Sequence, residues 1–251
     1  MSRRSSDWRP LDSEQSQRQI AELLDMLGSP PRTVLDLGCG DGRVMLPLVL
    51  HGHHVTGWDH DPAAIAAART ALRRLGVNAD DPRARTRLER RNFLAAWTDL
   101  RRRFDAAIML GRTLMTVTTH DHLATLFGQV AKRLTPGGLF VVDDFSTELW
   151  REVASGRWRE GVSRDGRMQL VWQPGEAIVA VRQGRRVNRR HWAPTRSDQR
   201  LRLWTTDDLN HHARSVDLRS APLRTGSTLR AWSRSGKVNV GEHRTGRRPS
   251  R

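Results

Sequence analysis

The sequence predicts an α/β fold built on a doubly wound, mostly parallel sheet, and two observations support this prediction. Short apolar runs alternate with amphipathic stretches over roughly the first 150 residues, which is the pattern of strands joined by helical crossovers. The apolar runs are nearly continuous and not alternating, as expected for strands that are covered on both faces. The chain has 251 residues, enough to bury a sizeable core.

The composition excludes several classes of protein. No stretch approaches 18 consecutive apolar residues, so we expect no transmembrane helix. The basic first ten residues lead into a polar stretch and not into an apolar signal segment, and we therefore expect a cytoplasmic protein. Cys39 is the only cysteine, and the histidines do not have zinc-site spacing, so the sequence predicts no disulfide and no metal site.

Each element of the first part follows from a local pattern. An amphipathic stripe predicts a lead-in helix, and apolar runs then predict strands separated by helices. Asp61 is placed to cap a helix whose first residue is Pro62. The expected helices are 11–27, 42–50, 62–75 and 122–134, and the expected strands are 33–38, 54–59, 86–91, 104–110 and 139–145, the last after a turn at 135–138.

The alternation stops after residue 150, where the pattern predicts antiparallel strands followed by a return to the sheet. Antiparallel strand structure is expected at 167–173, 176–183 and 185–204, then a helix at 206–213 and strands at 215–219 and 228–233. We therefore expect five parts, listed in chain order: an N-terminal lid helix (1–30), a ligand-binding core (31–150), an antiparallel insertion that covers the substrate (151–205), the last helix and strands of the core sheet (206–234), and a basic disordered tail (235–251).

The charge of the chain is uneven along its length. Residues 1–150 carry 20 basic and 18 acidic side chains, whereas residues 151–251 carry 23 and 9. A field of this sign attracts phosphates, nucleic acid or acidic substrates. Because only Lys132 and Lys237 are lysines, a general compositional bias toward arginine explains the charge equally well.

The strongest functional signal is the run from Val34 to Gly42, in which an apolar strand leads into a glycine-dense turn before a helix. Glycines there let the backbone approach a ligand closely, and a helix N-terminus offers free N–H groups. The third glycine of a dinucleotide fingerprint would fall at position 43, which is arginine, so a nicotinamide dinucleotide is disfavoured. Asp59 ends the next strand, where a carboxylate can accept hydrogen bonds from both hydroxyls of a ribose.

Four motifs in order, VLDLGCGDG, GWDHDPAAIAAAR, FDAAIML and LTPGGLFVVDDF, resemble the class I S-adenosylmethionine-dependent methyltransferases. The resemblance implies S-adenosylmethionine as the cofactor. It also implies a Rossmann-like, seven-stranded sheet with helices on both faces, an antiparallel last strand, and an antiparallel β insertion after strand five. The residues that this resemblance assigns to the cofactor site are Asp36, Gly38, Cys39, Gly40, Asp59, His60, Asn92, Phe93, Leu110 and Gly111.

The resemblance also implies methyl transfer to nitrogen or oxygen of a small-molecule acceptor. Arg112, after the fourth strand, and Trp8, before the lead-in helix, are the expected substrate residues. A general base is needed only for an acceptor that must lose a proton. The candidate bases are His120, His122, Asp143 and Asp144, of which the two aspartates face opposite sides of a strand.

Two other functions stay open. The basic C-terminal part favours a nucleic-acid methyltransferase, but the chain has Leu-Gly-Arg-Thr at 110–113, where such enzymes have an Asn/Asp-Pro-Pro-aromatic motif. A non-catalytic binding module on the same fold is also possible, because a fold does not fix a function.

Overall fold

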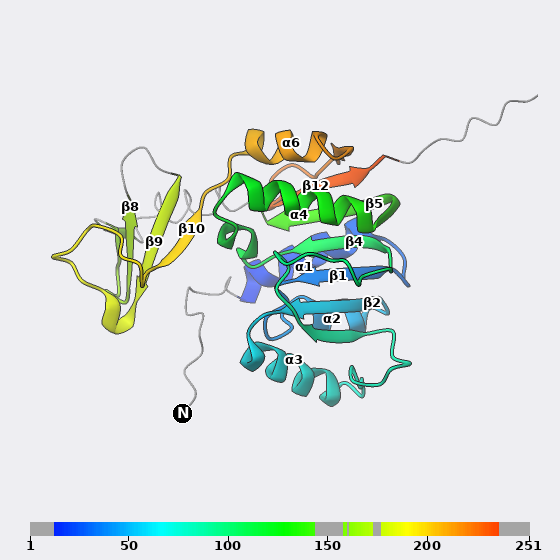
Figure 1. Cartoon of the computed structure of the whole chain (residues 1–251). Helices are drawn as coiled ribbons and strands as arrows, with labels where there is room; N and C mark the ends of the chain where they lie inside the picture. Colours follow the sequence, from blue (N-terminus) through cyan, green and yellow to red (C-terminus); the bar gives the residue numbers. More distant parts are fainter. Residues whose placement is uncertain (1–12, 144–157, 160, 173–176, 236–251) are drawn as a thin grey trace, which may run out of the picture.

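The computed structural model describes residues 13–143, 158–159, 161–172 and 177–235, and it contains two sheets (Figure 1). The larger sheet has seven strands in the order β11-β12-β5-β4-β1-β2-β3. Neighbouring strands from β3 to β5 are all parallel. At the other end of the sheet, β12 is antiparallel to both β5 and β11. These strands are β1 (Thr33–Leu37), β2 (His54–Asp59), β3 (Arg87–Arg90), β4 (Phe104–Met109), β5 (Leu134–Asp143), β11 (Leu218–Ser220) and β12 (Leu229–Arg234).

Helices cover both faces of this sheet. Neighbouring strand residues point to opposite faces, so the apolar strands have a buried cluster on each side. One buried cluster joins Leu35 and Leu37 of β1 to helices α4 (His120–Arg133) and α6 (Thr206–Arg214). The other joins Val34 to helices α1 (Ser13–Leu27), α2 (Met45–Leu50) and α3 (Pro62–Arg74). The doubly wound fold and the antiparallel end of the sheet are therefore confirmed.

Local sequence signals explain where several helices begin. Asp61 accepts a hydrogen bond from the amide of Ala63 at 2.8 Å, and Pro62 begins α3, as predicted. Thr119 caps α4 through the amide of His122, so this helix begins at His120, two residues before the predicted start. The helix predicted at 42–50 begins only at Met45, because Gly42 has a φ of +96° and continues the turn.

The smaller sheet, called the cap here, is antiparallel throughout, with the order β10-β9-β8-β7-β6. Its strands are β6 (Trp158–Arg159), β7 (Val162–Ser163), β8 (Met168–Trp172), β9 (Ile178–Gln183) and β10 (Gln199–Arg202). One face packs Leu170, Val181 and Leu201 against Met115, which lies in the 3-10 helix η1 (Thr113–Thr116) after β4. The cap therefore lies at the carboxyl edge of the parallel strands, where it is drawn in Figure 1.

The expectation of strand structure across 185–204 is wrong for most of that range. A short 3-10 helix, η2 (Gly184–Arg186), follows β9, and residues 187–198 form a long loop before β10. The loop is shaped by a buried ion pair, in which Arg182 of β9 binds Asp198 at 2.9 Å. Sequence patterns alone do not reveal such a pair, because its two residues lie on opposite sides of the loop.

We expect the Asp198→Asn variant to lose about 3 kcal/mol of stability, because breaking a buried ion pair leaves the remaining charge uncompensated. Both side chains are almost fully buried, at 3% and 4% exposure. Hydrogen exchange of residues 178–202 should accelerate while the core strands keep their protection. Unchanged exchange in this range would contradict the assigned role of the pair.

The division of the chain into five parts stays a prediction, and its boundary at 150 lies outside the described residues. Trp8, Asp144 and most of the tail at 235–251 lie outside the described residues. Within the part of the chain that is described, no helix is long and apolar enough to cross a membrane.

Candidate cofactor site at the carboxyl edge

The glycine turn after β1 forms the floor of the candidate site. Gly38, Gly40 and Gly42 all have positive φ values, between +57° and +96°. The amides of Gly38 and Cys39 donate to the carbonyl oxygen of Trp58 at 2.7 and 2.9 Å, which ties the turn to β2. A methyl group at Gly40 would meet no atom within 4 Å, so the backbone faces open space at this point. Glycine at this position therefore leaves room for a ligand against the main chain.

Asp59 ends β2 beside the same turn. Its Oδ2 accepts a hydrogen bond from the amide of Gly40 at 2.9 Å, and its Oδ1 accepts one from the amide of Asp61 at 2.9 Å. His60 lies on the surface with its Nδ1 3.6 Å from Asp59 Oδ1. The structure thus brings Asp59, Gly40 and His60 together, and their role in cofactor binding stays a prediction. A carboxylate fixed in this way keeps lone pairs available for hydroxyl donors.

Asp36 of β1 is the buried acidic group of the site. It is 2% exposed, and its Oδ2 has no hydrogen-bond partner among the described residues. Burial raises the pKa of Asp36 to about 7, although the positive charge of Arg43 acts in the opposite direction and the charge of Asp59 adds to the rise. A buried acceptor without a partner is costly. A ligand that donates a hydrogen bond or carries positive charge would satisfy it.

Cys39 contributes its backbone and not its thiol to the turn. The side chain is 5% exposed, and a methyl group at Gly57 of β2 would lie 2.9 Å from its Sγ. Burial, followed by the charges of Asp36 and Asp59, raises the pKa of the thiol above its ordinary value. The thiol is therefore a core group and a poor nucleophile.

The residues after β3 and β4 occupy the same edge with different exposure. Asn92 is exposed, and its Oδ1 accepts from the amide of Leu94 at 2.9 Å, which closes a local turn. Phe93 and Leu110 are buried at 8% and 5% exposure and belong to the two core clusters. These three positions stay predicted cofactor contacts, and only Asn92 presents its side chain at the surface.

Asp143 at the end of β5 holds the loop that follows β4. Its Oδ2 accepts hydrogen bonds from the amides of Gly111 and Arg112 at 2.7 and 3.0 Å. Gly111 and Arg112 both have left-handed φ values, +72° and +70°, which is uncommon for arginine. Burial raises the pKa of Asp143, while the two amides lower it. Because its carboxylate is engaged in this way, Asp143 positions the loop and is a poor candidate for a general base.

Arg43 is a site residue that the sequence analysis used only to disfavour a dinucleotide. Its guanidinium donates to Ser16 Oγ at 3.0 Å and to Gln19 Oε1 at 2.9 Å, both on α1. A methyl group at Gly111 would lie 3.6 Å from Arg43 Nη2, so the same guanidinium reaches the loop after β4. Its charge also acts on Asp36 and Asp143. Arg43 therefore connects the lead-in helix to the carboxyl edge.

Gln19, the partner of Arg43 on α1, is a buried polar residue, and the sequence alone does not show this contact. Gln19 lies beside the apolar stripe of α1, yet it is 1% exposed, and its Nε2 has no partner among the described residues. A buried amide beside an arginine marks a polar contact within an otherwise apolar interface. The contact itself joins residues 24 positions apart, which no local pattern shows.

His120 lies at this edge, but both of its ring nitrogens are engaged. Arg202 of β10 approaches His120 Nε2 at 2.9 Å, and because a guanidinium only donates, Nε2 accepts. The other nitrogen, Nδ1, then donates to His212 Nε2 of α6 at 3.2 Å. Trp204 packs edge-on against His120 and lies under the Arg202 guanidinium. This contact joins the cap to α4 and α6, so a clamping role fits His120 better than the predicted role of base.

His122, the other predicted histidine, is exposed on the first turn of α4, and its backbone amide serves the helix cap. Arg112 is half-buried, and its amide donates to Asp143 in the loop after β4. Their assigned roles stay predictions.

The histidine contact predicts a loss of stability in acid. Burial, His120 and His211 lower the pKa of His212 below the ordinary value of 6.5, while Asp208 acts in the opposite direction. The unfolded chain therefore takes up this proton first as the pH falls, so the contribution of His212 to stability is lost below about pH 6.5. Urea unfolding at pH 7.5 and 5.5 measures the loss, and it should be smaller in the His212→Asn variant. His53 and His54 also have lowered pKa values and remain in both proteins, so an equal loss in both would contradict the role of His212.

Comparison with known proteins shows which proteins the chain resembles. Residues 34–138 match the family described as "Methyltransferase domain". Over 175 residues the chain is 31% identical to a trans-aconitate 2-methyltransferase of Acidovorax ebreus (strain TPSY), a match that covers 61% of this chain and 58% of that protein. The matched segments span between 13% and 58% of the length of the curated relatives.

Solved structures show the same fold. A S-adenosylmethionine-dependent methyltransferase from Clostridium acetobutylicum ATCC 824 superposes with a TM-score of 0.63 at 14% identity, covering 90% of this chain and 93% of that one. CalS10, an amino pentose methyltransferase from Micromonospora echinaspora, superposes with a TM-score of 0.57 at 20% identity, covering 89% and 93%. With the sheet order and the glycine turn, these matches show that the chain has the fold of the S-adenosylmethionine-dependent methyltransferases and that residues 34–138 match a methyltransferase domain.

Proposed function

We propose that the chain transfers a methyl group from S-adenosylmethionine to nitrogen or oxygen of a small-molecule acceptor. The observation that carries this proposal is the arrangement of Asp59 and the open backbone of Gly40 at the end of β1 and β2, beside the unsatisfied Oδ2 of Asp36. Relatives named for trans-aconitate and for an amino pentose support a small acceptor.

The residues present fit the cofactor. Asp59 would accept hydrogen bonds from the ribose hydroxyls, and Gly38 and Gly40 would let the backbone approach the amino-acid end. Asp36 is a buried acceptor without a partner among the described residues, which suits the positively charged amino group of that end. When bound, the cofactor supplies a methyl group that its sulfonium already activates.

The chain then has to orient the acceptor and exclude water. The loop after β4 is rigidly held, because Asp143 binds two consecutive amides and Thr113 Oγ1 donates to the Leu110 carbonyl oxygen at 2.9 Å. The apolar face of the cap closes the edge beside η1 through Met115. These two features would place the acceptor opposite the methyl group in a dry setting.

The hydrogen bonds of two candidate bases, His120 and Asp143, favour some acceptors over others. Among the described residues, the ring nitrogens of His120 and the carboxylate of Asp143 already have hydrogen-bond partners. An amine in its neutral form or a carboxylate can attack without a protein base, whereas an alcohol must first lose its proton. We therefore favour an amine or a carboxylate as the accepting group.

A methyl-transfer assay tests the proposal. Purified protein is mixed with S-adenosylmethionine and separate panels of carboxylic acids, amino sugars, alcohols and RNA, and formation of S-adenosylhomocysteine is measured. We expect the original chain to methylate a small amine or carboxylate. The Asp59→Ala variant should show no turnover with the same acceptor. Transfer to RNA alone would contradict the proposal and would favour the nucleic-acid alternative that the basic C-terminal part suggests.

A further inference from the structure

The loop that follows β9 concentrates positive charge on the cap. Residues 184–202 contain seven arginines and a single acidic residue, Asp198, which is buried against Arg182. Six of the seven are exposed, namely Arg185, Arg186, Arg189, Arg190, Arg196 and Arg200. In the described ranges 161–172 and 177–202, the only carboxylate besides Asp198 is Asp165. The buried pair is neutral, so the net charge lies on the outside of this segment.

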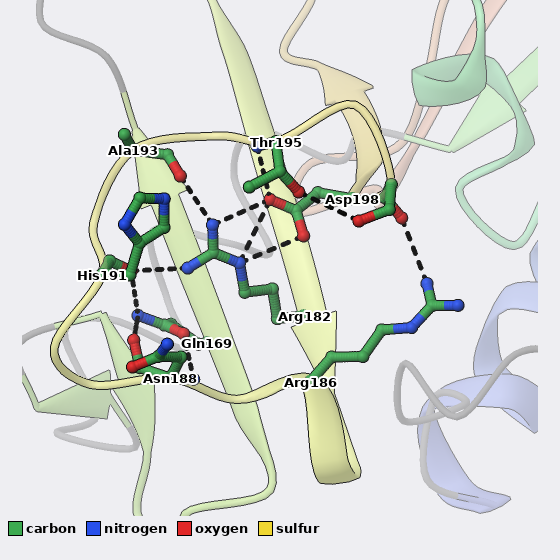
Figure 2. A network of polar contacts seen from close by, with 9 residues as sticks. Gln169, Arg182, Arg186, Asn188, His191, Ala193, Thr195 and Asp198 are labelled. Carbon is green, nitrogen blue, oxygen red and sulfur yellow. Dashed lines mark hydrogen bonds and ion pairs between the residues drawn. The ribbon is translucent and has the colours of Figure 1, made fainter.

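A buried polar network gives the loop one shape (Figure 2). Arg182 donates to the carbonyl oxygens of His191 and Ala193 at 2.5 and 2.6 Å, as well as to Asp198. Gln169 of β8, which is fully buried, donates to the carbonyl oxygen of Asn188 at 2.9 Å and accepts from its amide at 2.9 Å. The loop backbone is thus bound from inside by groups of β8 and β9.

A loop held by such a network differs from a loop whose backbone is hydrogen-bonded mainly to water. Burying an arginine and an aspartate has a desolvation cost, and a buried ion pair is weak evidence for stability alone. Here every described bond of Arg182 ends on Asp198 or on a loop carbonyl. The arrangement fixes the course of residues 188–198, and the arginines of that course remain exposed.

An exposed aromatic ring lies within the same loop. Trp192 is 41% exposed, its Nε1 donates to the carbonyl oxygen of Arg189 at 2.8 Å, and its ring would meet a methyl group at Gly161. Arg189 also lies against Gly166, in the β7–β8 turn that carries the exposed Arg164 and Arg167. Arg189 therefore contacts both the partly exposed Trp192 and the β7–β8 turn, which carries two further exposed arginines.

We propose that this loop surface binds single-stranded nucleic acid. Guanidinium groups bind phosphates, and a partly exposed tryptophan offers a face on which a base can stack, which together suit a flexible strand without sequence preference. The proposal is independent of methyl transfer, since it concerns the outer side of the cap and assigns no reaction to the nucleic acid.

Fluorescence anisotropy with a labelled 20-nucleotide polyuridine RNA tests the proposal on the full chain. We expect binding that weakens as salt rises, because each phosphate contact contributes about 0.7 to the slope of log affinity against log salt. The triple variant with Arg189, Arg190 and Arg196 changed to glutamine should lower that slope by about 2 and weaken binding at least roughly tenfold at low salt.

A matched control separates a local surface from the net charge of the chain. Arg74, Arg83 and Arg101 are exposed arginines of the core, and changing these three to glutamine removes the same charge. The control should bind RNA within about twofold of the original chain, and circular dichroism confirms that both triple variants fold. The proposal would be overturned if both triple variants lost the same affinity, or if the original chain did not bind RNA. It would also be overturned if polyglutamate or phosphatidylserine vesicles bound more tightly than RNA.

Discussion

Replacing Asp59 by alanine is expected to lower the affinity for S-adenosylhomocysteine by at least about 100-fold while the protein stays folded. The carboxylate would accept two hydrogen bonds from the ribose, and a hydrogen bond to a charged group contributes about 1.5–3 kcal/mol. A loss of about 3 kcal/mol corresponds to roughly 100-fold in affinity. The same change removes the acceptor of the Gly40 amide, so the glycine turn also loses its tie to β2 at that point.

Isothermal titration calorimetry measures this effect. The Asp207→Ala variant is a suitable control, since Asp207 is an exposed aspartate in the first turn of α6. The control should keep the affinity of the original chain. Affinity within about twofold of the original in a folded Asp59→Ala variant would remove Asp59 from the cofactor site.

The Gly38→Ala variant is expected to lose about 2–4 kcal/mol of stability, for two reasons. Gly38 has a φ of +75°, where a residue with a Cβ is strained by about 1 kcal/mol or more. In addition, the new methyl group would overlap Thr113 Cγ2 and lie 2.8 Å from Thr113 Oγ1. Overpacking of this kind typically costs about 1–3 kcal/mol, and it would push the loop after β4 away from the glycine turn.

A double-mutant cycle separates the two contributions. Urea unfolding of Gly38→Ala, Thr113→Ala and the double variant should show that the Gly38 change costs less when Thr113 has been shortened. The difference in the free-energy cost of Gly38→Ala between the two backgrounds measures the contact of Gly38 with Thr113. If the cost is the same in both backgrounds, the glycine is required for its backbone conformation alone.

The parts of the fold that were predicted correctly depend on neighbouring residues. Three features follow from residues that are close together in the sequence. They are the strand at 54–59, the helix cap by Asp61 and the glycine turn. The pairing of Asp59 with Gly40 was also predictable, because the carboxyl ends of adjacent parallel strands meet at one edge.

The parts that could not be predicted depend on contacts between distant residues. Arg43 binds Gln19 of α1, and Asp143 binds amides 31 and 32 positions earlier in the chain. His120 is a candidate base by sequence alone, because the Arg202 side chain that donates to its Nε2 lies 82 positions later in the chain. The long loop after β9 differs from the strand that the sequence predicts, because contacts with the buried Arg182 and Gln169 determine its shape.

Binding of the cofactor product tests the central claim most directly. Thermal unfolding is recorded with S-adenosylhomocysteine, with NAD, and without ligand. A ligand at one hundred times its dissociation constant adds about 2.7 kcal/mol, which for a chain of this size corresponds to a rise of roughly 5–11 °C in Tm. We predict that rise with S-adenosylhomocysteine and none with NAD, whereas a folded protein whose Tm does not change with S-adenosylhomocysteine would contradict the account.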